Sequence, residues 1–279
     1  MIALVAHPGQ QHLLQLLASR LEISAILNPW RTPFRAAPAP VFSQLSALLA
    51  AGAPDACCFL RPYGGLEQDI STCLERQVRV LSAGPADLPA SPLWNWGGQH
   101  LHSPLFQAAS GQRRSPAFGT PVYLRRLVGG GTDLLDAWWA ACQLLTEARD
   151  LIGAEAVEVQ LAACRAGRQH HLALTVAFAN RATAHLVVAP HYFSPSTDLT
   201  LLGSGGLVFS DAPANAAHQT GSSGVRLHPP PFLHPEPGWI AEFLQRLDQP
   251  APAAHPALEL HLLAALRQAL RLGQLVRVR

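Results

Sequence analysis

The sequence predicts an α/β first half, built as a doubly wound parallel sheet, and an α+β second half with an open, mainly antiparallel sheet. In the first half, short apolar runs alternate with amphipathic runs of helical period, a pattern typical of parallel sheets. After Pro121, one long helical run is followed by runs that alternate in polarity or are wholly apolar, which favours antiparallel strands. With 279 residues, 49% of them hydrophobic, the chain can bury one large core or two medium ones, which excludes a disordered protein.

The elements of the first half follow one another as strand and helix. Strands are expected at residues 2–5, 23–27, 56–60 and 78–81, and helices in the run that ends at Arg20, at 43–51 and at 66–76. A proline-rich segment at 32–40 replaces what would be another helix or strand, so this half is abbreviated.

The second half opens with its longest helix, expected at 132–151. Strands are expected at 157–162, 172–178 and 184–188, hairpin turns at 180–181 and 203–206, and closing helices at 239–247 and 256–272. We therefore predict two domains, residues 1–119 and 120–279, with the C-terminal helices packing back toward the first domain.

Composition excludes several classes of function. The formal net charge is only +2 and no basic run concentrates it, so we expect no nucleic-acid role. All 20 residues of the Lys+Arg count are arginines. Without a lysine, the chain has no Schiff-base nucleophile, no pyridoxal-phosphate anchor and no phosphate-loop lysine.

The five cysteines form no C-x-x-C pair, and their odd number in apolar surroundings favours reduced, buried thiols over a disulfide framework. No basic leader segment follows Met1, and no apolar stretch reaches membrane-spanning length before a proline, glycine or charge interrupts it. We expect a cytoplasmic protein that is neither exported nor inserted in a membrane.

Phrases along the whole chain occur in an order that resembles one family. They are Pro54-Asp-Ala-Cys-Cys-Phe-Leu-Arg-Pro62, Val80-Leu-Ser-Ala-Gly-Pro85, Phe118-Gly-Thr-Pro-Val-Tyr-Leu-Arg125, Gly129-Gly-Gly131 before Asp136, Leu201-Leu-Gly-Ser-Gly-Gly-Leu-Val208, and the tail from Trp239 to Val276. The chain resembles a divergent, shortened member of the glucose-fructose oxidoreductase / inositol dehydrogenase / MocA (Gfo/Idh/MocA) family of NAD(P)-dependent oxidoreductases. The resemblance implies a Rossmann-like N-terminal domain.

The dinucleotide motif of that family is degenerate in this chain. Its three glycines fall on Ala6, Pro8 and Gln11, although a pyrophosphate cradle needs glycines for close approach and free N–H groups at a helix N-terminus. We therefore expect no cofactor, with an adapted NAD(P) site as the alternative. The residues that would bind such a cofactor are His7, Gly9, Gln10, Asn28 in place of the ribose-binding acid, Arg61 and Pro62.

The resemblance places the catalytic lysine of the family on Gly84 and its histidine on Ala140, which leaves only Asp136 of the proton-transfer set. A carboxylate is also favoured in the first turn of a helix by the helix dipole alone. Whether the protein is an enzyme therefore stays open. His100, His102 and Tyr192 are the candidate replacement acids.

Aromatic residues offer a candidate ligand cleft. We expect Trp94, Trp96 and Asp136 to line one pocket with an imidazole of His100 or His102 in reach, and Trp139 to fill part of it. The alternative is that the two indoles of 94–96 only plug a core. Adjacent histidines such as His170 and His171 point to opposite faces of a strand, so we expect no metal site.

Two functions remain. The first is an oxidoreductase-family protein without the usual cofactor and proton-transfer residues, acting as a small-molecule ligand-binding or accessory subunit. The second is a working NAD(P)-dependent oxidoreductase on a sugar-like or other small carbonyl or imine substrate, with a relocated acid. A structural assembly role would need no cleft. In each case the apolar strands predict a homo-oligomer or heteromer formed through the outer face of the C-terminal sheet.

Overall fold

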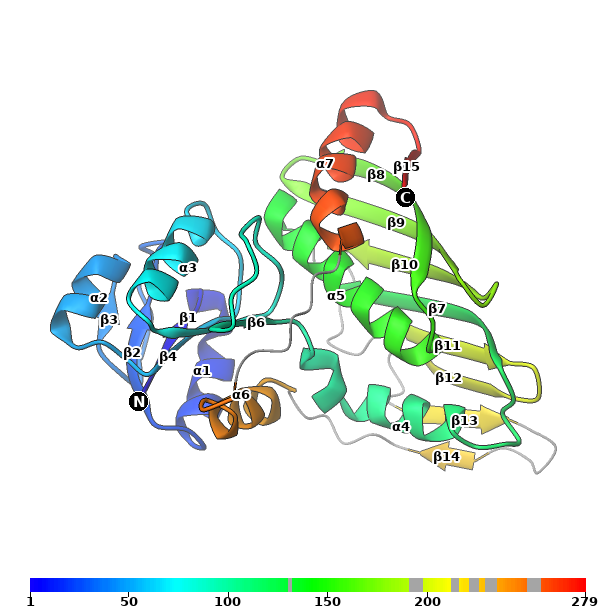
Figure 1. The fold of residues 1–279 in the computed structure, drawn as a ribbon, viewed down its shortest axis with the longest axis horizontal. Helices are drawn as coiled ribbons and strands as arrows, with labels where there is room; N and C mark the ends of the chain where they lie inside the picture. Colours follow the sequence, from blue (N-terminus) through cyan, green and yellow to red (C-terminus); the bar gives the residue numbers. More distant parts are fainter. Residues whose placement is uncertain (130–131, 191–197, 212–215, 221–225, 229–234, 250–256) are drawn as a thin grey trace. The chain divides into compact units, whose positions relative to one another are not determined.

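The computed structural model describes residues 1–129, 132–190, 198–211, 216–220, 226–228, 235–249 and 257–279. Contacts divide the chain into two compact units (Figure 1). The first contains Met1–Gln99 and His234–His255, and the second His100–Leu233 and Pro256–Arg279. Residues 100–119 thus group with the second unit, whereas the sequence-based division, which stays a prediction, groups them with the first.

The first unit is built on a six-stranded parallel sheet, as its apolar runs predict. The strand order is β3-β2-β1-β4-β5-β6, so the sheet is doubly wound around its central pair β1 and β4. Central strands of this kind are covered on both faces, which is why they consist of uninterrupted apolar residues. The strands are β1 Ile2–Val5, β2 Ile23–Leu27, β3 Val41–Phe42, β4 Ala56–Phe59, β5 Arg79–Ser82 and β6 Trp94–Trp96.

Helices of the first unit bury one apolar stripe each. In α1 the stripe is Leu13, Leu14 and Leu17, spaced as a helix face requires. Helix α6 belongs to the C-terminal half of the sequence but contacts α1. The helical segments are the 3-10 turn η1 Pro8–Gln10, α1 Gln11–Ala18, α2 Leu45–Ala51, α3 Leu66–Glu75 and α6 Glu236–Gln245. No helix joins β2 to β3, which agrees with the predicted abbreviation.

The second unit is built on a nine-stranded sheet in the order β14-β13-β12-β11-β7-β10-β9-β8-β15. Its neighbouring strands are antiparallel except β7 and β10, which confirms a mainly antiparallel sheet. The strands are β7 Pro121–Gly129, β8 Ala156–Ala166, β9 Gln169–Phe178, β10 Thr183–Ala189, β11 Asp198–Gly203, β12 Leu207–Asp211, β13 Ala216–Thr220, β14 Arg226–His228 and β15 Val276–Val278.

The glycine-rich hairpin between β11 and β12 has a steric cause. A Cβ atom on Gly203 would lie 2.3 Å from the carbonyl oxygen of Phe118, and one on Gly205 would lie 2.6 Å from that of Ala117. The hairpin therefore packs directly on the backbone that leads into β7, and only glycine leaves room for it.

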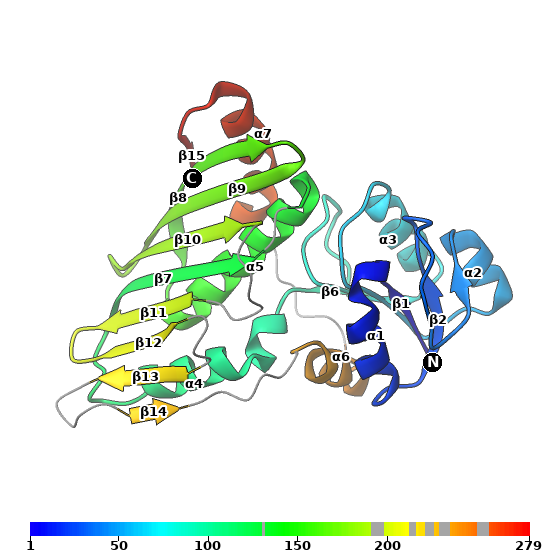
Figure 2. The ribbon, with the colours of Figure 1, turned by 180° about the vertical axis from the view of Figure 1, so that it is seen from behind.

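Helices of the second unit gather on one face of this sheet, where α5 contacts β7, β9 and β10 (Figure 1). No described helix of the unit lies on the opposite face (Figure 2). The helical segments are η2 Gln99–His102, α4 Pro104–Arg113, α5 Leu134–Ile152 and α7 Ala257–Leu272. Among the described residues, no helix is both long enough and apolar enough to cross a membrane.

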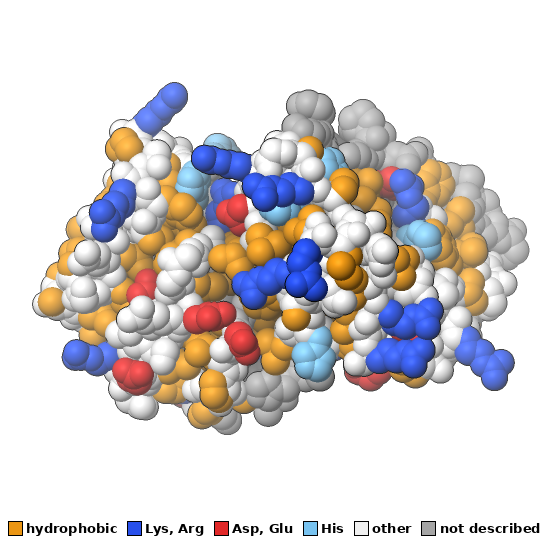
Figure 3. Space-filling model, turned by 90° about the horizontal axis from the view of Figure 1, so that it is seen from above, with side chains coloured by type: hydrophobic (Ala, Val, Ile, Leu, Met, Phe, Trp, Pro, Cys, Tyr) orange, Lys and Arg blue, Asp and Glu red, His pale blue; other side chains and the backbone are white. Residues whose placement is uncertain are grey.

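Charged side chains of both signs occur on the face of the molecule drawn in Figure 3. On the face drawn in Figure 3, arginine side chains lie in separate groups between apolar and acidic ones.

Candidate functional site at the carboxyl edge of the parallel sheet

Open parallel sheets bind ligands outside the carboxyl ends of their strands, at the point where the strand order reverses. In the first unit this point lies between β1 and β4. The residues that follow the strands at this edge are His7 after β1, Asn28 after β2 and Arg61 after β4. A functional site of the first unit is therefore expected among them.

The turn after β1 uses its own side chains to satisfy its backbone. The N–H of Gly9 donates to His7 Nδ1 at 3.0 Å, and the N–H of His7 donates to Gln10 Oε1 at 3.0 Å. The N–H of Gln10 donates to the carbonyl of His7 at 2.8 Å, and Pro8 has no N–H. Partial burial, and then the charge of Arg61, lowers the pKa of His7, which keeps Nδ1 an acceptor.

The position that the resemblance assigns to the third glycine of the dinucleotide motif, Gln11, is also occupied by a side chain with a partner. Gln11 Oε1 accepts the N–H of Arg35 at 3.1 Å. Asn28 Nδ2 donates to the carbonyl of Thr32 at 2.6 Å. These two bonds tie the proline-rich connection to the start of α1 and to the end of β2.

A row of aromatic rings crosses the same edge. The indole of Trp30 meets the imidazole of His7 edge to face, with ring centroids 5.1 Å apart, and the ring of Tyr63 at 5.4 Å. The three residues follow β2, β1 and β4, so Trp30 lies against the point at which the strand order reverses. Tyr63 is fixed by a hydrogen bond from its hydroxyl to Asp69, a carboxyl whose pKa is raised by burial.

Sequence reasoning missed Trp30 and Tyr63. Their positions, three and four residues past a buried strand, were a usable signal, because such residues reach the carboxyl edge. Of the predicted cofactor residues, His7, Gly9 and Gln10 lie in the self-bonded turn, and Arg61 and Pro62 follow β4 directly after Leu60.

A cavity of about 740 Å³ lies past the ends of β2 and β3. Asn28 is 4% exposed and contributes to its wall, and its Oδ1 has no hydrogen-bond donor among the described residues. The remaining lining residues come from the connection between the strands and from the start of α2: Arg31, Thr32, Pro33, Phe34, Ala37, Val41, Phe42, Ser43 and Gln44.

The predicted tryptophans occupy packed positions. Trp94 is a residue of β6, and its indole N–H donates to Ser82 Oγ at 2.9 Å inside the first unit. Ser82 Oγ in turn donates to the carbonyl of Gly84, a buried residue at the position that the resemblance assigns to the catalytic lysine. Trp96 ends β6 and is half-buried. Trp139 is buried on α5 in the second unit.

Asp136 acts as part of a helix cap. Its Oδ2 accepts both the N–H and the hydroxyl of Thr132 at 3.0 Å, and its own N–H donates to Asp133 Oδ1 at 2.9 Å. An acidic residue is favoured at this position by such capping hydrogen bonds and by the helix dipole.

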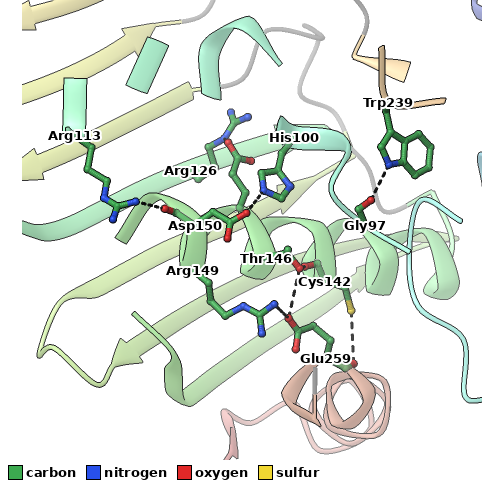
Figure 4. A network of polar contacts seen from close by, with 11 residues as sticks. Gly97, His100, Arg113, Arg126, Cys142, Thr146, Arg149, Asp150, Trp239 and Glu259 are labelled. Carbon is green, nitrogen blue, oxygen red and sulfur yellow. Dashed lines mark hydrogen bonds and ion pairs between the residues drawn. The ribbon is translucent and has the colours of Figure 1, made fainter. Parts of the chain in front are cut away.

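His100 lies next to Asp150, at the other end of α5 from Asp136. Its Nε2 is 2.6 Å from Asp150 Oδ2, and Arg113 donates to the carbonyl of Asp150 at 2.6 Å (Figure 4). Asp136 and Asp150 lie at opposite ends of α5, fourteen residues or about 21 Å apart along the helix. The structure therefore does not bring His100 and Asp136 together. His102 ends η2, and Tyr192 lies outside the described residues.

No protein-family model and no curated protein matches the sequence. An oxidoreductase from Agrobacterium radiobacter, solved with NAD+, L-tartaric acid and magnesium, is 15% identical, with 99% of this chain and 97% of that chain covered and a TM-score of 0.71. A myo-inositol dehydrogenase from Corynebacterium glutamicum is 17% identical, with 100% and 98% covered and a TM-score of 0.69. An aldose-aldose oxidoreductase from Caulobacter crescentus, complexed with glycerol, is 14% identical, with 100% and 99% covered and a TM-score of 0.71.

The chain has the two-domain fold of these oxidoreductases. The expected fold class is thereby confirmed. The expectation that no cofactor binds gains no support from these structures, because one of them was solved with NAD+. Among the residues that the structure describes, no group of three or more histidine, cysteine or acidic side chains could hold a metal ion.

Proposed function

We propose that this chain is a divergent protein of the Gfo/Idh/MocA type that binds a small ligand in its first unit and does not transfer hydride from NAD(P) bound in the usual way. The observation that carries this proposal is the indole of Trp30, which lies between His7 and Tyr63 at the reversal point of the sheet. The self-bonded turn after β1 adds to it.

The residues at this edge do not fit a pyrophosphate. Phosphate oxygens need the N–H groups that His7 and its neighbours already use, and they need glycines at positions that hold Ala6, Pro8 and Gln11. Breaking three hydrogen bonds costs about 1 kcal/mol each, and separating two aromatic pairs costs about 0.5–1.5 kcal/mol each. The sum of several kcal/mol weakens binding by about a hundredfold or more.

The proton-transfer residues support the same conclusion. Dehydrogenation of a hydroxyl requires a base, and Gly84 and Ala140 have no side chain that titrates. Asp136 is engaged in its helix cap.

The test is calorimetric titration of the full chain with NAD+, NADH, NADP+ and NADPH, together with a turnover assay on polyols and aldoses. We expect no saturable binding at micromolar concentration and no change in nicotinamide absorbance. Micromolar affinity together with turnover would overturn the proposal.

The second candidate is a working NAD(P)-dependent oxidoreductase with a relocated acid. The pair His100 and Asp150 favours it, because a carboxylate that holds an imidazole is a common arrangement for proton transfer. In that case a His100→Asn variant would lose turnover while its fold and cofactor affinity stay unchanged.

A further inference from the structure

The turn that follows α7 exposes apolar side chains. Leu272 ends the helix and is 46% exposed, and Leu275 directly precedes β15 and is 57% exposed. The turn leads into the last strand of the nine-stranded sheet and lies at the rim of the second unit in both views (Figures 1 and 2). We propose that this turn, residues 272–275, here called the α7 tip, docks on the surface of an anionic lipid membrane.

The α7 tip is an ordered turn. Gly273 has φ of 59°, a left-handed conformation that commonly ends helices, and its N–H donates to the carbonyl of Ala269 at 2.9 Å. The chain then enters β15, where Val276 pairs with Leu161 of β8. Because the turn is fixed at both ends, the fold itself holds the two leucines in water. Transfer of their exposed surface to an apolar layer is favourable.

Positive charge lies on the helix side of the α7 tip. Four arginines and no acidic residue occur from position 267 to position 279. Arg267 and Arg271 are exposed and lie one turn apart on α7, so they share one face of the helix. Neither forms an ion pair with a residue that the structure describes. Their guanidinium groups are therefore available to an anionic surface.

Positive charge also lies on the strand side of the tip. Arg277 and Arg279 share one carboxylate, that of Glu158, at 2.7 and 3.7 Å, and their side chains stay 50% and 71% exposed. One carboxylate cannot neutralise two guanidinium groups, so these side chains keep a net positive charge. Each arginine near an anionic membrane surface strengthens binding by about fivefold.

An apolar turn between cationic flanks favours a lipid surface over an acidic protein. In a membrane, leucine side chains enter the apolar layer below the headgroups while guanidinium groups stay among the phosphates. A stable protein partner needs about 800 Å² of matched surface on each side. The apolar part of the α7 tip is only two side chains on one turn, which suits a fluid layer that adapts to its shape.

The test is sedimentation of the full chain with two kinds of vesicle, phosphatidylcholine alone and phosphatidylcholine mixed with phosphatidylserine. We expect binding to the anionic vesicles only. This binding should fall as salt rises from about 0.05 M to about 0.5 M, because salt screens exposed charges. Brominated acyl chains in the anionic vesicles should quench the fluorescence of a Leu275→Trp variant more than that of the unchanged protein, because the new indole would lie among them.

Two variants each remove one part of the interaction. The double change Leu272→Ser with Leu275→Ser should weaken binding to the anionic vesicles by about tenfold or more, and Arg271→Gln by about fivefold. The matched controls are Leu101→Ser, at a leucine that is 45% exposed, and Arg20→Gln, at an exposed arginine of the first unit. Both controls should bind like the unchanged protein.

The inference is overturned if anionic vesicles bind no more protein than neutral ones at low salt. It is also overturned if the double leucine variant binds like Leu101→Ser, or if Arg271→Gln binds like Arg20→Gln. Binding to soluble polyglutamate, with none to vesicles, would indicate an acidic protein partner and overturn it as well. The proposed function does not depend on these outcomes, because its ligand lies in the first unit.

Discussion

Arg126 on β7 donates through Nε to Glu147 Oε1 on α5 at 2.9 Å, with both side chains buried. This ion pair joins α5, the longest helix among the described residues of the second unit, to a central strand of its sheet. Because a buried charge left without its partner is expensive, we predict that Glu147→Ala destabilises this unit by about 3–5 kcal/mol. Urea unfolding followed by tryptophan fluorescence measures the loss.

Replacing both partners, with Arg126→Leu and Glu147→Leu, should restore most of that stability, because no charge is then left buried. Glu242→Ala is the matched control, since it breaks the exposed pair with Arg246 and should cost about 0–1 kcal/mol. Equal losses in the Glu147 and Glu242 variants would contradict the prediction.

Glu259 on α7 makes the second unit sensitive to pH. The residue is 0% exposed, and burial raises the pKa of its carboxyl above the ordinary value of 4.5, with Arg149 at 3.3 Å opposing the shift (Figure 4). A raised pKa stabilises the fold fully below pH 4.5, and this contribution is lost as pH rises through the folded pKa. We therefore predict that Glu259→Gln becomes more stable than the unchanged protein as pH rises.

The measurement is the melting temperature from about pH 4 to about pH 7. The difference between the Glu259→Gln variant and the unchanged protein should grow across this window. A Glu22→Gln variant is the control, because that side chain is exposed on the first unit, and its difference should stay flat. A difference for Glu259→Gln that stays constant or shrinks with rising pH would refute the assignment.

The strands of the first half could be predicted from the sequence because each is a short apolar run between turn signals; β1 and β2 have the bounds expected for them. Strand β6 and helix α4 were not predicted. The three residues Trp94–Trp96 show no periodicity, and α4 has few apolar residues on its buried face. Their structure depends on neighbours that are distant in sequence.

At the candidate site, the sequence predicts only that the glycines of the dinucleotide motif are missing. The sequence shows that glycines are missing at Ala6, Pro8 and Gln11, but it does not show what replaces their function. The contact of Trp30 with Tyr63 and the bond between Gln11 and Arg35 join residues that follow different parallel strands. Such contacts are set by the strand order, which local patterns do not encode.

The open face of the nine-stranded sheet leads to a prediction on self-association. Along β11, Leu201 is buried beneath the helices, and its neighbour Leu202, which points to the other face, is 40% exposed. We predict a homo-oligomer that buries this face, and we predict that Leu202→Arg makes it a monomer, because a charge cannot be buried there without a partner.

Light scattering at micromolar concentration measures the mass of each form. Leu272→Arg is the matched control, since Leu272 ends α7 and is 46% exposed, and it should leave the mass unchanged. A monomer mass for the unchanged protein would rule out self-association through this face.

The reversal point of the parallel sheet allows a gain-of-binding test. We predict that Pro8→Gly with Gln11→Gly strengthens NAD(H) binding only in combination with Trp30→Ala. The glycines free the backbone for close approach, but the indole still lies between His7 and Tyr63 until it is removed. In the triple variant the affinity should rise by about fivefold or more, since at least one aromatic contact of about 1 kcal/mol no longer opposes the ligand. Calorimetry and the rise in melting temperature with ligand concentration both measure this gain in affinity.

The control is Trp94→Phe, which alters an indole of the same unit away from this point. If the glycine pair alone gives the full gain, Trp30 is no obstacle; if the triple variant gives none, the edge does not face a dinucleotide at all.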